Sequence, residues 1–411
     1  MMVREHYLNK DLVYMKTFLE YKECEHENVL QTYARFDVCI VSGHGATAKD
    51  IDGKSYIDFG SGIGVNSLGY SDEGFAAAVT AQLSKLQHTS NLYYTAPMIE
   101  LAEALCGATG FGKVFFANSG AEANECAIKL ARKYSEDKYG AQRYKIITLI
   151  NSFHGRTIST LSATGQEEMH THFTPLTAGF VHVACGDIDA LKAELNDSVC
   201  AVMLEPIQGE GGIIPLDFVY MTEVEKLCRE HDILLISDEV QTGMSRTGKL
   251  LASEYSGVKP DITTLAKGLG GGLPIGACLC TNEVASHMQA GMHGSTFGGN
   301  PVVCAGANFV VETTKQPEFL QSVCQKGEFI RSQIENIPGV NEVRGIGLMI
   351  GIALDEGMPS ARTIAEKCLE CGLIILTAKS LLRLLPPLNI SENELKQGLD
   401  ILKSVLMEAK K

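Results

Sequence analysis

Short apolar runs alternate with helical segments from about residue 75 to about residue 305. Strands that are apolar on both faces, separated by helices of ~10–15 residues, indicate a mainly parallel sheet covered on both sides. The pattern therefore predicts an α/β fold. The runs expected to be strands are 114–117, 146–150, 202–204, 233–237 and 262–265, and the expected helices are 76–86, 98–108, 121–134 and 219–231.

The pattern changes after about residue 305, where long helical segments lead into strand-rich stretches and a final helix. A chain of 411 residues is long enough for two or three domains of ~100–200 residues. We expect a large α/β domain over 55–305. Residues 1–54 and 306–411 would combine into a second, smaller α+β domain.

Composition excludes several classes of function. Lys and Arg number 35 against 49 Asp and Glu, a net charge of −14, which disfavours nucleic acid and anionic membranes as partners. The 13 cysteines form no disulfide framework and no paired zinc motif, which is typical of a reducing compartment. No signal-peptide core or run of ~18 apolar residues is found. We expect a cytoplasmic protein without a bound metal.

Glycine is in excess, with 41 Gly against 12 Pro. The glycines come in bursts near residues 60–64, 209–212, 268–272 and 298–299. Such bursts are typical of tight βα turns, and also of backbone that lies close to a bound ligand.

Polar residues follow three of the expected strands, and ligands of open α/β sheets bind at the carboxyl ends of strands. Ser119 and Gly120 stand where the strand 114–117 gives way to a helix. The free N–H groups of a helix N-terminus bind anions, although Ser119 could equally be a simple helix cap. The first strand end is therefore a candidate anion site.

The other two strand ends carry opposite charges. Asp238 follows the strand 233–237, where it could face a ligand, hold a metal together with Glu239, or cap a helix. Lys267 follows the strand 262–265 and precedes a glycine run in apolar surroundings. A partly buried lysine has a lowered pKa and forms Schiff bases readily. A surface lysine in a glycine turn is the alternative.

Two familiar motifs are absent. The segment from Gly243 to Lys249 matches a nucleotide-binding P-loop except at its last position, where Leu250 replaces the Ser or Thr that binds Mg²⁺. No G-x-S-x-G segment supports a catalytic serine. ATP hydrolysis and serine-hydrolase chemistry are therefore disfavoured.

Taken together, the three strand ends resemble the site of the class III (ω-amino acid) aminotransferases, which are pyridoxal-phosphate enzymes of fold type I. The resemblance runs from about Tyr33 to Leu388, and within the class it is greatest to the acetylornithine aminotransferases. The supporting strings are Asn118-Ser-Gly-Ala-Glu-Ala-Asn124-Glu125, Phe153-His-Gly-Arg156-Thr157, Glu205-Pro-Ile-Gln-Gly-Glu210-Gly-Gly212, Ser237-Asp-Glu-Val-Gln241, Ala266-Lys267-Gly268, His293-Gly-Ser-Thr296-Phe-Gly-Gly-Asn300-Pro301 and Arg383-Leu-Leu-Pro386-Pro387-Leu388.

The resemblance implies a fold type I transferase whose large domain has a mainly parallel seven-stranded sheet. It also implies roles toward pyridoxal 5′-phosphate. Lys267 would hold the cofactor as a Schiff base, Asp238 would pair with the ring nitrogen and Gln241 would contact the ring hydroxyl. The remaining cofactor contacts would be Ser119, Gly120 and Ala121 at the phosphate, Phe153 on the ring face, and Thr296 at the phosphate of the neighbouring subunit in a homodimer.

The same resemblance implies roles toward two carboxylate substrates. Arg156 would bind the α-carboxylate of the amino donor, and Arg383 that of glutamate or 2-oxoglutarate. Glu210 would mask Arg383 when a distal amine reacts, although a solvated turn residue is the alternative. Ser295 and Tyr33 are further candidate substrate contacts. The implied reaction moves the distal amine of N2-acetylornithine to 2-oxoglutarate.

Other functions stay open. Other class III aminotransferases act on ornithine, 4-aminobutyrate or succinylated amino acids, and an aminomutase would need no 2-oxoglutarate. A non-catalytic protein that kept the fold is a third possibility, against which the intact Lys267, Asp238 and Arg383 argue. The family's usual His-Pro pair after Gly69 is replaced here by Tyr70-Ser71, which affects the expectation of local structure only.

Overall fold

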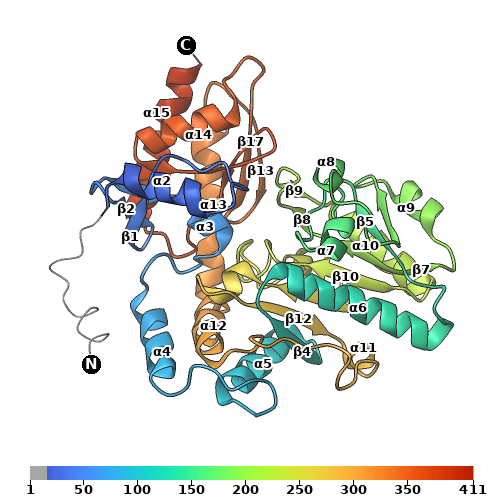
Figure 1. Cartoon of the computed structure of the whole chain (residues 1–411). Helices are drawn as coiled ribbons and strands as arrows, with labels where there is room; N and C mark the ends of the chain where they lie inside the picture. Colours follow the sequence, from blue (N-terminus) through green and yellow to red (C-terminus); the bar gives the residue numbers. More distant parts are fainter. Residues whose placement is uncertain (1–15, 411) are drawn as a thin grey trace.

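The computed structural model describes residues 16–410 of the chain (Figure 1). The first fifteen residues of the predicted N-terminal segment 1–54, and residue 411, lie outside the described part. One large sheet lies on the right of Figure 1, and two smaller sheets lie at the upper left, where blue N-terminal and red C-terminal segments mix.

The large sheet has seven strands in the order β4-β12-β11-β10-β7-β5-β6, and only β12 runs antiparallel to its neighbours. This confirms the predicted mainly parallel seven-stranded sheet of a fold type I transferase. The strands are β4 (Lys113–Ala117), β5 (Lys145–Leu149), β6 (Phe180–Val183), β7 (Val199–Leu204), β10 (Leu234–Asp238), β11 (Ile262–Leu265) and β12 (Gly276–Cys280).

Helices bury both faces of this sheet, which explains why its central strands are wholly apolar. Along β7, Ala201 and Met203 pack with helix α6 (Gly120–Tyr139) in one cluster. Val202 and Leu204 point the other way and pack with α10 (Phe218–Glu230) in a second. Smaller helices on this part of the chain are α7 (Ile158–Ala163), α8 (Glu167–His170), α9 (Ile188–Glu194) and α11 (Asn282–Ala285).

Three further helices pack beside the β4 edge. They are α4 (Glu73–Leu83), α5 (Ala96–Thr109) and α12 (Pro301–Thr314). Their apolar side chains share one cluster with Leu265 of β11 and Leu269 of the turn that follows it. The predicted domain boundary at residue 305 falls inside α12. This helix contacts α4 and α5. The boundaries at 54/55 and 305/306 stay predictions.

The two smaller sheets combine both ends of the chain. One has the order β1-β2-β3-β15 and the other β13-β14-β17-β16. The elements are α2 (Phe18–Asn28), β1 (Ile40–His44), β2 (Thr47–Asp50), β3 (Ser55–Asp58), α3 (Ser61–Gly64), α13 (Pro317–Ile334), β13 (Val340–Ile346), β14 (Met349–Leu354), α14 (Ala361–Glu370), β15 (Leu373–Ile374), β16 (Leu376–Ala378), β17 (Leu381–Leu384) and α15 (Glu392–Ala409). One apolar cluster joins Phe59 to Leu399 and Leu402 across this part.

Several polar contacts tie the smaller sheets to the large one. The buried Arg246 donates to the carbonyls of Leu348 at 3.1 Å and Pro386 at 2.5 Å, and burial lowers its pKa to about 9. Arg344 donates to the carbonyl of Gly212 at 2.9 Å. No helix within residues 16–410 is long and apolar enough to cross a membrane.

Candidate active site

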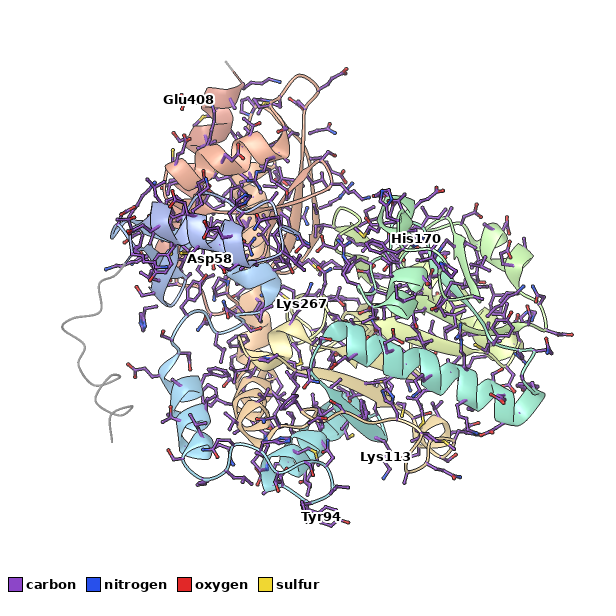
Figure 2. All side chains as sticks on the ribbon, in the orientation of Figure 1. Asp58, Tyr94, Lys113, His170, Lys267 and Glu408 are labelled. Carbon is purple, nitrogen blue, oxygen red and sulfur yellow. The ribbon has the colours of Figure 1, made fainter. Side chains whose placement is uncertain are left out.

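Eight of the predicted site residues line one cavity of about 440 Å³ at the carboxyl edge of the large sheet. Figure 2 shows Lys267 at this place, between the large sheet and the two smaller ones. The strands β4, β5, β10 and β11 all end here, because parallel strands present their carboxyl ends at the same edge. The predicted residues that line the cavity are Ser119, Gly120, Ala121, Phe153, Arg156, Asp238, Gln241 and Lys267.

The anion end of the cavity is the start of α6. Ser119 caps this helix, and its hydroxyl accepts from the N–H of Glu122 at 3.2 Å. The N–H groups of Gly120 and Ala121 have no partner inside the helix, because the first turn of an α-helix leaves its N–H groups free. A side chain at Gly120 would come within 2.7 Å of Val240 Cγ1. Only glycine lets the turn lie this close to the strand end of β10.

Asp238 ends β10 and is only 3% exposed. One carboxylate oxygen accepts from Asn124 Nδ2 at 2.7 Å and lies 2.8 Å from His154 Nδ1. The other accepts from the Val240 N–H at 3.0 Å. Thr264 completes the network by donating to Asn124 Oδ1 at 2.7 Å. The network fixes the Asp238 carboxylate in one orientation at the wall of the cavity.

Sequence reasoning assigned no role to His154, Asn124 or Glu205, although all three stand inside the quoted strings. Glu205 follows β7 and is 2% exposed. Its two carboxylate oxygens accept hydrogen bonds from the N–H groups of Phe153 at 2.9 Å and Gly209 at 3.2 Å. Burial, and then the charge of Asp238, raise the pKa of Glu205 to about 7, against the opposing effect of His154. The sequence signal that could have found it is a carboxylate directly after the apolar run that ends at Leu204.

Lys267 stands two residues after the end of β11. Its φ of +44° is a left-handed conformation, which non-glycine residues adopt rarely and mostly at functional positions. Burial lowers the pKa of the Lys267 amine to about 8, although Glu210 favours the charged form. A larger fraction of this amine is therefore neutral near pH 7 than for an exposed lysine.

Arg383 and Glu210 form an ion pair beside the cavity. Arg383 Nη1 lies 2.7 Å from Glu210 Oε1, and the Arg383 side chain is only 4% exposed. Arg383 comes from β17, whereas Glu210 lies in the turn between β8 (Ile207–Gln208) and β9 (Ile214–Pro215). Burial works to raise the pKa of Glu210, but Arg383 outweighs it and the pKa is lowered. The predicted masking pair is thus formed in the structure.

Arg156 is the second predicted carboxylate-binding arginine, and it differs from Arg383 in exposure and pairing. The residue is exposed, its guanidinium lies over the Phe153 ring at 5.5 Å, and within residues 16–410 it makes no ion pair. An unpaired guanidinium at the mouth of a cavity is available for bidentate binding of a carboxylate.

Five predicted residues do not line the cavity: Arg383 and Glu210, which form the ion pair beside it, and Tyr33, Thr296 and Ser295. Tyr33 is 73% exposed, and Thr296 is exposed on the segment between α11 and α12. Ser295 Oγ accepts from Asn118 Nδ2 at 3.1 Å, and Asn118 does line the cavity. Within residues 16–410, no contact brings Thr296 or Tyr33 to the cavity, so their roles stay predictions.

Comparison with known proteins identifies the family. The model described as Aminotransferase class-III matches residues 30–406. The chain belongs to the class-III aminotransferases. Such an enzyme is a pyridoxal-phosphate-dependent transferase, which confirms the cofactor and the enzyme class expected from the motifs. The class also agrees with the strand-end lysine and aspartate.

The chain is similar to acetylornithine aminotransferases and to ornithine aminotransferases. Acetylornithine aminotransferase of Haemophilus ducreyi is 52% identical over 388 residues, covering 94% of this chain and 98% of the relative. That of Caldanaerobacter subterraneus subsp. tengcongensis is 49% identical over 389 residues, covering 93% and 98%. Among solved structures, ornithine aminotransferase from Toxoplasma gondii has a TM-score of 0.92 at 31% identity and covers 99% of this chain and 98% of that one. N-acetylornithine aminotransferase from Stenotrophomonas maltophilia has a TM-score of 0.82 at 37% identity, covering 94% and 98%.

The cavity of this aminotransferase fits pyridoxal phosphate. Both side-chain amide atoms of Gln241 are buried and have no hydrogen-bond partner within residues 16–410, although Gln241 lines the cavity. A side chain at Gly209 would come within 2.3 Å of Gln241 Oε1, so glycine leaves room for the amide. Each group of the cofactor has a matching group in the cavity. The helix N-terminus matches the phosphate and the fixed carboxylate matches the ring nitrogen. The unpaired amide matches the ring hydroxyl, and the lysine amine matches the aldehyde.

Proposed function

We propose that this aminotransferase transfers the distal amine of N2-acetyl-L-ornithine to 2-oxoglutarate, giving N-acetyl-L-glutamate 5-semialdehyde and L-glutamate, a step of arginine biosynthesis. The observation that carries the proposal is the contrast between the paired Arg383 and the unpaired Arg156. The identities of 52% and 49% to acetylornithine aminotransferases support the choice of amino donor.

The residues would hold the cofactor as follows. The N–H groups of Gly120 and Ala121 and the hydroxyl of Ser119 would bind the phosphate, Asp238 would face the ring nitrogen and Gln241 the ring hydroxyl. Phe153 would cover one ring face. When bound, pyridoxal phosphate supplies an electron sink that weakens the bonds at the amine-bearing carbon. Thr296 would reach the phosphate of a second subunit, and we propose a homodimer for that reason.

Lys267 would act on the substrate as a general base. Because burial lowers the pKa of its amine to about 8, a neutral Nζ could take the proton from the amine-bearing carbon of the substrate and deliver it to the carbon of the cofactor that bears the imine. Arg383 and Glu210 lie close enough to influence this pKa. The pKa of Lys267 therefore depends on whether the ion pair between Arg383 and Glu210 is formed.

Substrate choice would follow from the two arginines. With Glu210 on Arg383, a carboxylate binds at Arg156, which places the distal amine of acetylornithine toward Lys267. Glutamate and 2-oxoglutarate carry two carboxylates and need both arginines, so Glu210 must leave Arg383. Ser295 and Tyr33 are proposed contacts of the acylated end. We also propose that the enzyme works in the cytoplasm.

Kinetics across amino donors test the proposal. We expect kcat/KM for N2-acetylornithine to exceed that for ornithine, 4-aminobutyrate and succinylornithine by about tenfold or more, which corresponds to ~1.4 kcal/mol. Lys267→Ala serves as the control, because it should lose both turnover and the visible absorbance of bound cofactor. A preference for unacylated ornithine would overturn the proposed donor.

Ornithine is the second candidate donor, because a solved ornithine aminotransferase has the higher TM-score of the two structures compared above, 0.92 against 0.82. Backbone similarity reports the shared fold, however, and donor choice depends on a few side chains in the pocket. The same donor series decides between the two.

A further inference from the structure

The turn that carries Glu210 is held by a second arginine besides Arg383. This turn, residues 209–212, joins β8 to β9 and is called the gate turn below; Figure 1 shows both strands beside β13. Arg383 holds the Glu210 side chain at 2.7 Å. Arg344 donates from Nε to the main-chain carbonyl of Gly212 at 2.9 Å. One arginine therefore binds a side chain of the gate turn, and the other binds its backbone.

Both arginines stand in one row of the same small sheet. Arg344 of β13 is paired with Gly351 of β14, and Gly351 is paired in turn with Arg383 of β17. Residues directly opposite each other on neighbouring strands point to the same face of a sheet. Since neighbouring strands lie ~4.8 Å apart, the two arginines project from one face, roughly 10 Å from each other.

The gate turn rests on this face between the two arginines. A side chain at Gly351 would come within 2.9 Å of Ile213 Cβ and within 3.6 Å of the Gly212 carbonyl oxygen, so glycine makes room for the turn. Ile213 directly follows the gate turn, is fully buried, and packs with Met349 and Leu385. The turn is thus docked on the sheet by contacts that do not involve the Glu210 side chain.

The two arginines differ in how easily they can be released. Arg383 binds a carboxylate, which the carboxylate of a substrate can replace, whereas Arg344 binds a main-chain carbonyl. At the other end of the gate turn, the Gly209 N–H donates to Glu205 Oε1 at 3.2 Å. Both ends of the turn are therefore fixed, and the part between them that can move is Glu210 and the residue after it.

We propose that Arg344 is a positioning residue that keeps the gate turn on the small sheet when Glu210 leaves Arg383, so that this carboxylate stays close enough to return. A turn that is already fixed has little backbone entropy to lose when the ion pair forms again, which favours the masked state. Without the Arg344 bond, the turn gains conformations in which Arg383 is unmasked. The inference rests on the proposed masking of Arg383 by Glu210.

The first test compares two neutral replacements of Arg344 in the holoenzyme. Gln carries an N–H donor at the same number of bonds from Cα as Arg Nε, whereas Met carries a methyl group there. Single-turnover loss of the visible cofactor absorbance gives a second-order rate constant for each amino donor. Arg344→Met should raise the ratio of the glutamate constant to the N2-acetylornithine constant about fivefold, or ~1 kcal/mol for one lost hydrogen bond. Arg344→Gln should stay within about twofold of the parent ratio.

The direction of the change separates this role from simple electrostatics. Both replacements remove a positive charge, which weakens the attraction for the second carboxylate of glutamate and lowers the ratio in both variants. A rise confined to Arg344→Met therefore requires the hydrogen bond. Glu342→Ala is the control and should leave the ratio unchanged, because Glu342 bonds to Nη1 of Arg344 and not to Nε. Both constants come from one sample, so incomplete folding of a variant does not alter the ratio.

The second test asks whether Arg344 acts through Glu210. Once Glu210→Ala has unmasked Arg383, a loosened turn has no further effect on masking, so adding Arg344→Met should not raise the ratio again. A merely structural role of Arg344 would give the same factor in both backgrounds. That result, or a ratio that stays level or falls in Arg344→Met alone, would overturn the inference.

Failure of the proposed function would appear differently. If Glu210→Ala itself leaves the ratio unchanged, Arg383 is not masked, and the role of Arg344 is overturned together with the masking. If the parent enzyme prefers ornithine, only the proposed amino donor is wrong. The ratio measured with ornithine in place of N2-acetylornithine then tests Arg344 in the same way.

Discussion

The two ends of the active-site cavity differ in how their charges are satisfied. At the cofactor end, Asp238 is held by Asn124, His154 and a backbone N–H, and it is almost fully buried. At the substrate end, Arg383 is paired with one carboxylate from a glycine-flanked turn, and Arg156 has no ionic partner within residues 16–410. In the proposed function, the group that must stay fixed, Asp238, has several partners, whereas the group that must serve two substrates, Arg383, has one carboxylate partner.

The largest expected effect breaks the fixed end. Asp238→Asn keeps the shape of the side chain but removes its charge, while His154 and Asn124 still surround it. Because electrostatic stabilisation by a fixed charge is typically worth 10²–10³ in rate, kcat should fall by about 10³. Steady-state kinetics with saturating cofactor measure this. Glu239→Gln is the matched control, since that neighbouring buried carboxylate bonds to Thr242 and the N–H groups of 252 and 253, away from the cavity. A loss below about tenfold would show that the fixed end is not needed.

A smaller effect tests the switchable end. Glu210→Ala leaves Arg383 unmasked, so kcat/KM for glutamate should rise relative to that for N2-acetylornithine by about tenfold, or ~1.4 kcal/mol. The same ratio measured for Glu342→Ala provides the control, because Glu342 pairs with Arg344 at 3.3 Å outside the cavity. If the ratio is the same in Glu210→Ala and in the parent enzyme, the ion pair does not control substrate choice.

The last effect is on stability and not on catalysis, and it concerns Glu205, which accepts from the N–H groups of Phe153 and Gly209. Its pKa is raised from 4.5 to about 7, so the folded protein binds a proton that the unfolded chain releases between these values. Stability from this group is therefore lost as pH rises from about 4.5 to about 7. Glu205→Gln carries no such proton, so its stability relative to the parent should improve over this pH range, by at most about 3 kcal/mol.

Thermal unfolding of both proteins at several pH values measures that difference. A stability difference that stays constant from about pH 5 to pH 7 would mean that Glu205 is charged throughout and is tied more tightly to His154 than its surroundings indicate.

The sequence predicts the fixed end better than the switchable end. Asp238, Lys267 and Ser119 stand at the ends of apolar strands, and the rule that ligands bind there brings them together correctly. Asn124 and His154 escape that rule because they lie in a helix and a loop, 114 and 84 positions from the carboxylate they contact. Patterns of local spacing carry no information on contacts of that range.

Element boundaries show the same limit on a smaller scale. Apolar periodicity places a helix at 76–86, whereas α4 begins at Glu73, because Asp72 caps it by accepting from the N–H of Phe75 at 2.9 Å. The run 202–204 belongs to a longer strand, β7, which begins at Val199. Polar caps and strand partners extend elements past the residues that carry the apolar pattern.

Arg383 and Glu210 come from separate sheets, β17 on one side and the β8–β9 turn on the other. Their ion pair therefore also links the two parts of the molecule. The hydrogen bonds that Arg246 and Arg344 donate to the carbonyls of Pro386 and Gly212 do the same. If glutamate displaces Glu210, as the proposed function requires, this contact between the two parts is lost and they are free to separate slightly. Amide protons along β17 should then exchange faster during the glutamate half of the cycle than during the acetylornithine half.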